Sequence, residues 1–384
     1  MEYEPLAEGD RSRLAEILNA SFHVPGMRAE QWIERQGIEV CRVIRRGHEL
    51  LGGLMILDMA QFYGGRSLPM GGISAVGVAP EARGGGAASR LMAGAIQELH
   101  QRQVPLSALY PATQTLYRKS GFEQAGARAE FRLNLRMGPV QERALPLVKL
   151  PREPKLLEKV YRSWARPQQG ALDRTEPNWR RVLSPRDEPT EVYGVGDPLE
   201  GYVVVHRQAG SQPGWQNLAL TDFVALTPRA ARRIYSFLAD HRSLAEQAVW
   251  FGAPHQPLLT VLAEQYVETR INIIWMLRLV DVPAALRGRG YSPHLKCAFK
   301  LAVDDPLLAS NRGSWWVRIE AGRAEVEKAR SGGLKVSERA LACLYGGFLS
   351  PWQARLAGLI DWPDRDLSAL EGVFGSPAGM GDMF

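Results

Sequence analysis

The chain has 384 residues, 45% hydrophobic and 23% charged, which is the balance of a folded globular protein and enough length for two or three domains. The formal net charge of +6 has no long run of one sign behind it, so we expect no nucleic-acid partner. No eighteen apolar residues run together and the N-terminal residues lack an apolar leader, so we expect a cytoplasmic protein with no membrane partner.

The N-terminal third of the chain carries the pattern of one α+β domain. The first predicted helix has Asp10 as its candidate N-cap. The predicted elements are, in order, a helix at 10–22, two strands around a turn at Gly47, a strand that ends at Pro80, a helix with apolar residues from Leu91 to Leu99, a short strand at 104–112, a short helix at 113–121 and a closing strand at 127–137.

Prolines and charges over 137–157 predict a linker, and the rest of the chain divides into two further regions. The middle region mixes strand-like and helical segments, including a helical pattern at 257–267, but contains no glycine cluster. The last region begins with a strand and a short helix over 271–291 and continues with paired strands over 314–329 and helices at 337–348 and 350–360. We place the domains at 1–146, 147–275 and 276–384.

Three consecutive glycines stand between the strand that ends at Pro80 and the following helix. A P-loop would need a lysine here, and a dinucleotide turn would need glycine where Ser89 stands. The segment from Val78 to Ala88 reads V-x-P-x-x-R-G-x-G-x-A, whose backbone N–H groups can converge on an anion at the start of a helix. The sequence therefore predicts a pyrophosphate site made mostly of backbone. The alternative, a plain turn with positive φ, is usually met by one glycine.

This segment resembles the acetyl-CoA signature of the GNAT N-acetyltransferase superfamily, and "TLYRKSGFEQAG" resembles the Y-x-x-x-G-F element of that superfamily. The whole arrangement, with "WMLRLVDVPAALRGRGY" and "LYGGFLSP" near the end, resembles the Eis (enhanced intracellular survival) acetyltransferases. The resemblance implies an α+β chain of two tandem GNAT-like domains, the second without the cofactor motif, followed by a domain like that of sterol carrier proteins. It also implies acetyl-CoA as co-substrate and a homo-oligomer, a hexamer in that family.

The resemblance carries over to particular residues. Pantetheine would bind as a pseudo-strand along Val76, Gly77 and Val78, although Gly77 is also readable as a β-bulge glycine. Tyr117, in the Y-x-x-x-G-F element, matches the general-acid tyrosine of the family. A phenol of pKa about 10 beside a thiolate leaving group of pKa about 8.5 is a reasonable proton-donor pair. The alternative role of Tyr117 is to pack the short helix onto the sheet. The remaining implied cofactor contacts are Gly84, Gly85, Gly86, Ala87, Ala88, Ser89, Ala112 and Thr113.

The resemblance also implies that the base is the carboxylate of the last residue, here Phe384. A chain end with glycines behind it ordinarily frays, but an aromatic anchor favours a pocket. Glu123 and Asp382 are the fallback bases. Cys41 has no evident histidine partner, so we expect direct attack of the amine rather than an acyl-cysteine.

Metal and disulfide sites are not predicted. The seven histidines are scattered without ligand spacing, and Cys41, Cys297 and Cys343 are read as three buried thiols.

The family resemblance implies that the acetyl acceptors are primary amines of aminoglycoside-like compounds, polyamines or lysine side chains. The alternative hypothesis is a non-catalytic acyl-CoA- or lipid-binding module. The C-terminal tryptophans Trp315, Trp316, Trp352 and Trp362 are candidates to line a lipid cavity, but a packed core that presents Phe384 is the favoured interpretation.

Overall fold

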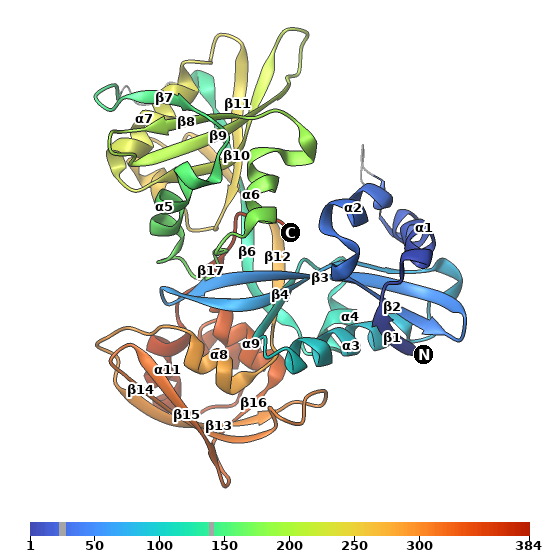
Figure 1. Cartoon of the computed structure of the whole chain (residues 1–384). Helices are drawn as coiled ribbons and strands as arrows, with labels where there is room; N and C mark the ends of the chain where they lie inside the picture. Colours follow the sequence, from blue (N-terminus) through green and yellow to red (C-terminus); the bar gives the residue numbers. More distant parts are fainter. Residues whose placement is uncertain (23–27, 138–141) are drawn as a thin grey trace. The chain divides into compact units, whose positions relative to one another are not determined.

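The computed structural model describes residues 1–22, 28–137 and 142–384 (Figure 1). The chain forms two compact units. Unit 1 contains Met1–Gly126, Ile274–Ala378 and Phe384, and unit 2 contains Ala127–Ile273 and Gly379–Met383. Most of the first and third predicted domains therefore share one unit. Among the described residues, no helix is long and apolar enough to cross a membrane, and no cluster of metal-ligating side chains occurs.

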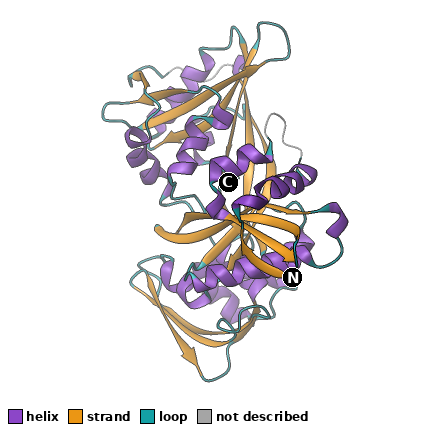
Figure 2. Cartoon of the chain, turned by 45° about the vertical axis from the view of Figure 1, so that its right-hand side comes forward, coloured by secondary structure: helices purple, strands orange, loops and turns teal. Residues whose placement is uncertain are grey.

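The N-terminal part of unit 1 is a twisted sheet with helices on both faces (Figure 2). Strands β1 to β4 pair antiparallel in chain order, β5 is parallel to β4, and the end of β12 is antiparallel to β5. The elements are β1 (Glu2–Pro5), α1 (Arg11–Ser21), α2 (Ala29–Gln36), β2 (Cys41–Arg46), β3 (Glu49–Tyr63), β4 (Arg66–Val78), α3 (Ala87–Gln101), β5 (Leu106–Leu109), α4 (Gln114–Arg118) and β12 (Val267–Leu279).

Helices α1 and α3 cover opposite faces of this sheet. The apolar residues of α3, among them Leu91, Ala95 and Leu99, pack against Ile73 and its neighbours in the buried core. Glycines in the strands make room for both helices, because an added Cβ at Gly71 would meet the Leu99 side chain and one at Gly77 would meet Leu18 of α1. Tight helix-to-sheet packing thus explains these two glycines.

The N-terminus of α1 differs in one detail from the prediction. The helix begins at Arg11, so Asp10 occupies the N-cap position, but its carboxylate makes no cap hydrogen bond. It pairs instead with the guanidinium of Arg45 on β2. The charge-assisted pair between Asp10 and Arg45 replaces the expected cap hydrogen bond.

The C-terminal part of unit 1 has a four-stranded sheet in the order β15-β14-β13-β16, with a buried helix, α9, that follows β16. Its elements are α8 (Val282–Gly288), β13 (Cys297–Asp304), β14 (Gly313–Glu320), β15 (Arg323–Ala329), β16 (Leu334–Ser337), α9 (Glu338–Gly346), α10 (Pro351–Leu356), α11 (Asp364–Phe374) and the start of β17 (Ala378–Gly379).

The C-terminal tryptophans do not share one environment. Trp315 and Trp362 are buried and donate their indole N–H groups to backbone carbonyls at 2.8 Å, whereas Trp352 is exposed. An open pocket of about 830 Å³ in this region is lined by Asp304, Lys335, Asp361 and other residues, and not by these indoles. Two of the four tryptophans are therefore core residues, as the favoured interpretation expects.

In unit 2 the strands lie in the order β6-β11-β10-β9-β8-β7. Only β10 and β11 are parallel, and the other neighbours are antiparallel. The core is aromatic, with Trp250 stacked on Phe131 and in edge contact with Phe223. The elements are β6 (Glu123–Asn134), whose first residues up to Gly126 belong to unit 1, β7 (Leu147–Leu150), α5 (Pro154–Ala165), α6 (Glu176–Leu183), β8 (Glu191–Val195), β9 (Gly201–Ala209), β10 (Gln216–Ala225), α7 (Pro228–Ala239) and β11 (Ala245–Gly252).

The structure corrects two secondary-structure predictions. The segment 137–157 is not simply a linker, because it contains β7 and the first turn of α5, while 138–141 lie outside the described residues. The helical pattern at 257–267 gives only a short 3₁₀ helix at Pro257–Val261. There the chain must enter β12 at Val267, and that tertiary requirement overrides the local pattern.

Short 3₁₀ helices connect several of the strands and helices. Besides Pro257–Val261 they are Glu8–Asp10, Ile38–Val40, Pro80–Ala82, Leu135–Met137 and Pro185–Asp187.

Candidate active site

Strands β4 and β5 separate part of the way along their length. Their parallel pairing ends at Ile73 and Leu109, but β4 continues to Val78 along β3. A register shift in the β3–β4 pairing and a positive φ of 54° at Ala75 mark a bulge at the same point. Beyond the bulge, one edge of β4 has no strand partner among the described residues, so its backbone groups are available to a ligand.

The three residues predicted to contact pantetheine lie on this free part of β4. Val76 and Val78 pack against the core beneath α3, and Gly77 faces α1. The bulge residue is Ala75, so the interpretation of Gly77 as a β-bulge glycine is wrong. Gly77 is required because an added Cβ would lie 2.9 Å from Leu18 and 3.1 Å from the Ser21 hydroxyl.

The glycine turn lies directly before α3. Gly84 and Gly86 both have φ of +81°, and Gly86 is the left-handed N-cap of the helix. The first N–H groups of α3, at Ala87, Ala88 and Ser89, have no carbonyl partner within the helix. An added Cβ at Gly84 or Gly86 would meet nothing within 4 Å, so the turn is an open cradle that fits an anionic pyrophosphate.

Two of the three glycines, Gly84 and Gly86, have a positive φ, whereas a plain turn usually needs only one such glycine. Gly85 has no positive φ, and the nearest atom to its added Cβ would be 3.4 Å away. The Arg46 guanidinium lies 3.7 Å from that Cβ position and adds positive charge beside the cradle. Arg46 was not predicted, because it belongs to β2, far from the turn in sequence.

Ala112 and Thr113 are exposed and lie between β5 and α4. Thr113 stands at the N-cap position of α4 in an extended conformation, without a side-chain cap hydrogen bond. Both therefore lie in the loop that follows β5, the strand that diverges from β4.

Tyr117 is buried on α4. Its ring makes an edge contact with Phe122 at 6.4 Å between centroids, so it does pack the short helix onto the sheet. Its hydroxyl donates no hydrogen bond to any described residue, and burial raises the pKa of Tyr117 to about 12. The packing role and an acid role are compatible, because the phenol stays protonated in the neutral range.

Phe384 is buried in unit 1, where the two strands diverge. The Ser74 hydroxyl donates to a carboxylate oxygen of Phe384 at 3.5 Å, and the Phe384 ring lies 5.2 Å from the Tyr110 ring. Ser74 and Tyr110 are the first residues after the last β4–β5 pair. An added Cβ at Gly72 would lie 3.0 Å from the Phe384 ring, so that glycine helps to form the pocket. The default expectation of a frayed end is wrong.

Both fallback bases are held by arginines. Burial alone would raise the pKa of Glu123, but hydrogen bonds from Arg118 and Arg339 outweigh it and hold that pKa below its ordinary value. Asp382 forms an ion pair with Arg174 in unit 2. Because its pKa is lowered, Glu123 is a poor proton acceptor.

The cysteines are only partly as predicted. Cys41 and Cys343 are buried, but Cys297 is half-buried. Burial raises the pKa of Cys41 to about 11 and that of Cys343 to about 12, so neither forms a thiolate readily.

The fold and the site define a class. A strand pair that opens at a bulge, next to a glycine turn on a helix N-terminus, is the arrangement of an acyltransferase of the coenzyme A-dependent class. Models of GNAT acetyltransferase domains match residues 2–125 and 170–279, and a model of the sterol carrier protein domain matches residues 282–379. These matches confirm the predicted fold class, in which tandem GNAT domains are followed by a sterol-carrier-like domain.

The chain belongs to the GCN5-related N-acetyltransferase family. Its sequence is 33% identical to that of a GCN5-related N-acetyltransferase from Anabaena variabilis. The crystal structure of that protein matches this chain with a TM-score of 0.94, and the match covers 100% of both chains. The chain is 24% identical to the N-acetyltransferase Eis of Mycobacterium tuberculosis over 72% of this chain and 71% of that protein. The structure of Eis1 from Mycobacterium abscessus has the same fold, at 22% identity, 100% coverage of both chains and a TM-score of 0.81. The predicted Eis resemblance is confirmed, and the chain is an N-acetyltransferase of the kind that uses acetyl-CoA.

Proposed function

We propose that this enzyme transfers the acetyl group of acetyl-CoA to a primary amine by direct attack, with the Phe384 carboxylate as base and Tyr117 as acid. The observation that carries the proposal is the burial of a terminal carboxylate where β4 and β5 diverge, next to Ser74. A negative charge there attracts a cationic ammonium and is in place to take its proton.

The co-substrate has a matching site in unit 1. The free edge of β4 at Val76–Val78 would hold pantetheine, and the N–H groups of residues 84–89 would hold the pyrophosphate beside Arg46. Bound there, acetyl-CoA supplies an activated thioester. The bulge at Ala75 turns the β4 backbone where an N–H group is needed near the thioester oxygen.

Tyr117, the proposed acid, and Phe384, the proposed base, are both buried residues. An ordinary carboxylate is a weak base for an ammonium, so the proposed role depends on how Phe384 is placed, with its residue buried and its carboxylate beside Ser74. Tyr117 donates its proton to the departing thiolate and does not lose it to solvent, because burial raises its pKa. The raised thiol pKa values of Cys41 and Cys343 favour direct attack over an acyl-cysteine.

The acceptors we propose are primary amines, namely aminoglycosides, polyamines or lysine side chains, and the assembly we propose is a homo-oligomer, a hexamer as in the Eis family. Release of free thiol from acetyl-CoA with each class of amine identifies the acceptor. Light scattering coupled to gel filtration gives the oligomeric state. Acetyl-CoA binding without amine-dependent thiol release over the whole panel would favour the alternative of a non-catalytic binding module.

The decisive experiment changes only the charge of the last residue. A chain that ends in a Phe384 carboxamide, made by peptide ligation, keeps the aromatic anchor but has no carboxylate. We expect its kcat to fall by about 100-fold or more, the usual contribution of a general base, with acetyl-CoA binding nearly unchanged.

The matched control is the same ligation with a free acid at Phe384, which reproduces the whole treatment except the charge. Full activity of the carboxamide would exclude the Phe384 carboxylate as the base.

A further inference from the structure

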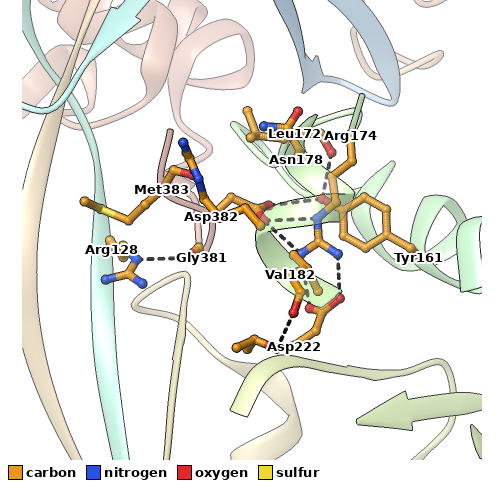
Figure 3. A network of polar contacts seen from close by, with 12 residues as sticks. Arg128, Tyr161, Leu172, Arg174, Asn178, Val182, Asp222, Gly381, Asp382 and Met383 are labelled. Atoms are coloured by element: carbon orange, nitrogen blue, oxygen red, sulfur yellow. Dashed lines mark hydrogen bonds and ion pairs between the residues drawn. The ribbon is translucent and has the colours of Figure 1, made fainter. Parts of the chain in front are cut away.

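The last residues before Phe384 are held one by one within unit 2. The Gly379 N–H donates to the Gln169 carbonyl at 3.0 Å, and the Met380 N–H to the Ala127 carbonyl at 3.2 Å. Further contacts go to the Gly381 carbonyl from Arg128 Nε at 2.8 Å and to the Asp382 carboxylate from Arg174 at 2.9 Å (Figure 3). Arg181 donates to the Met383 carbonyl at 2.5 Å. We call residues 379–383 the tail.

The tail lies against a second opening between strands. In unit 2 the parallel pairing of β10 and β11 ends at Ala219 and Val249, and β10 has a register shift between Leu220 and Asp222. This repeats, in the domain without a glycine turn, the bulge and divergence of β4 and β5. The unpaired end of β11 therefore has a free edge, as β4 has in unit 1.

Two tail glycines fit closely against the end of β11. An added Cβ at Gly381 would lie 2.9 Å from the Phe251 carbonyl oxygen and 3.2 Å from Gly252 Cα. One at Gly379 would lie 2.4 Å from the Ala253 side chain. These glycines are required by close backbone packing and do not loosen the chain end.

Arg174 joins the tail to β10. Its guanidinium donates two hydrogen bonds to Asp222 of β10, at 2.5 and 3.2 Å, and also pairs with Asp382. It is 4% exposed, and it lies 3.8 Å from the centroid of the Tyr161 ring and 4.9 Å from that of Trp179. The ion pairs are thus shielded from water, where truncating one partner has a large effect.

We propose that the second domain positions the catalytic carboxylate: the opening between β10 and β11 holds the tail through Arg174 and Asp382, and so fixes the chain from which Phe384 extends. The inference rests on the proposed function, because Met383 and Phe384 are joined by one peptide bond and the carboxylate of Phe384 is the proposed base. Arg174 and Asp382 are positioning residues and take no part in the proton transfer itself.

The test uses Asp382→Ala in the full chain. This variant leaves Arg174 paired with Asp222 through its two terminal nitrogens, and Tyr161 keeps its 2.7 Å hydrogen bond to the Leu172 carbonyl. It removes the 3.0 Å hydrogen bond from Arg174 Nε to Asp382, so only folded protein is compared. Gly381→Ala releases the tail in a different way, by collision with Phe251. The control is Asp240→Ala, which breaks an exposed pair with Arg143 in the same unit.

Two measurements are made on each folded variant. Carboxypeptidase digestion, followed by amino-acid analysis, gives the rate at which Phe384 is released. Steady-state kinetics give kcat and the KM for acetyl-CoA. For Asp382→Ala and Gly381→Ala we expect Phe384 release about tenfold faster, kcat at least about tenfold lower and a KM within about twofold, because misplacing a reacting group lowers kcat. Asp382→Glu should restore part of both effects.

The outcomes separate the inference from the function on which it rests. Unchanged Phe384 release in Asp382→Ala and Gly381→Ala would overturn the inference, even if the carboxamide enzyme were inactive. Faster release of Phe384 with an unchanged kcat would overturn the role of Phe384 as the base. The tail contacts would then have no part in catalysis.

Discussion

Tyr117 and Phe384 are both removed from bulk water, and their burial changes what each can do. The sequence suggests a phenol with a pKa near 10, whereas burial raises the pKa of Tyr117 to about 12. A group with a raised pKa holds its proton to higher pH, so Tyr117 stays protonated at neutral and mildly alkaline pH. For the proposed acid role the cost is a weaker driving force, because a thiolate of pKa about 8.5 is a weaker base than the phenolate of Tyr117.

At this scale we predict that Tyr117→Phe lowers kcat by about 100-fold and leaves the KM for acetyl-CoA within about twofold, because it removes the acid and keeps the packing against Phe122. In the unmodified enzyme, kcat should not fall between pH 9 and 10 through loss of this proton, because the pKa of Tyr117 is about 12. Both statements are checked by steady-state kinetics of thiol release.

Tyr291→Phe is the matched control for Tyr117→Phe. Burial raises the pKa of Tyr291 to about 12 as well, but its hydroxyl donates to the Leu286 carbonyl in the C-terminal part of unit 1. It should lose some stability and no activity. Equal kinetics for the two variants would remove the acid role of Tyr117.

At the scale of elements, the turn before α3 combines two properties that the glycines provide. The left-handed conformations at Gly84 and Gly86 aim the first N–H groups of the helix outward, and the missing side chains leave the cradle open. The left-handed conformation affects the stability of the free protein, whereas the absence of side chains affects only the binding of a ligand.

The two properties are separable by substitution. Gly86→Ala should cost about 1–2 kcal/mol of stability, the strain of a left-handed alanine. It should also raise the KM for acetyl-CoA by about tenfold, because the methyl group meets nothing in the free protein and would crowd the pyrophosphate. Thermal unfolding and titration with coenzyme A measure the two effects.

Gly214→Ala is the corresponding control, since Gly214 has φ of +84° and equally open surroundings in the exposed turn between β9 and β10. A similar loss of stability is expected there, with unchanged kinetics. If both variants kept full affinity for coenzyme A, the glycine cradle would not be the pyrophosphate site.

At the scale of the molecule, the first GNAT domain and the sterol-carrier-like domain share one compact unit. One link between them is an ion pair. Arg339 on α9 donates to Glu123 at 2.5 Å, and Arg118 donates to the same carboxylate at 2.7 Å. Glu123 is buried, so both guanidiniums compensate for its desolvation.

We predict that Glu123→Gln lowers the free energy of unfolding by about 1–3 kcal/mol at pH 7, toward the smaller figure because the arginines are partly exposed to water. The folded pKa of Glu123 is lowered, so its stabilisation is complete above the unfolded pKa and is lost as pH falls through the folded value. The difference between variant and unmodified protein should therefore shrink below about pH 4. Urea unfolding at several pH values checks this.

Asp364→Asn provides the comparison for Glu123→Gln, because Asp364 pairs with Arg355 while its own side chain is largely exposed. Its effect should be within about 0.5 kcal/mol at every pH. A pH-independent effect of Glu123→Gln would contradict the electrostatic explanation.

Sequence reasoning succeeded where the signal is local. The turn before α3, the short helix of Tyr117 and the paired strands over 314–329 depend on residues within one or two turns of each other. It failed where a contact with residues far away in the sequence overrides the local pattern. Val267 must join β12, so the helix expected at 257–267 is reduced to Pro257–Val261, and Asp10 leaves its cap for Arg45.

The conformation of the glycine turn before α3 is therefore readable from the amino-acid order, because a left-handed glycine and a helix N-terminus need no distant partner. The pocket of Phe384 is not readable in this way. Ser74 and Phe384 are 310 positions apart, and Asp382 and Arg174 are 208 apart. Only folding brings such groups together, since the free energy of burying a charge depends on partners that the local sequence does not specify.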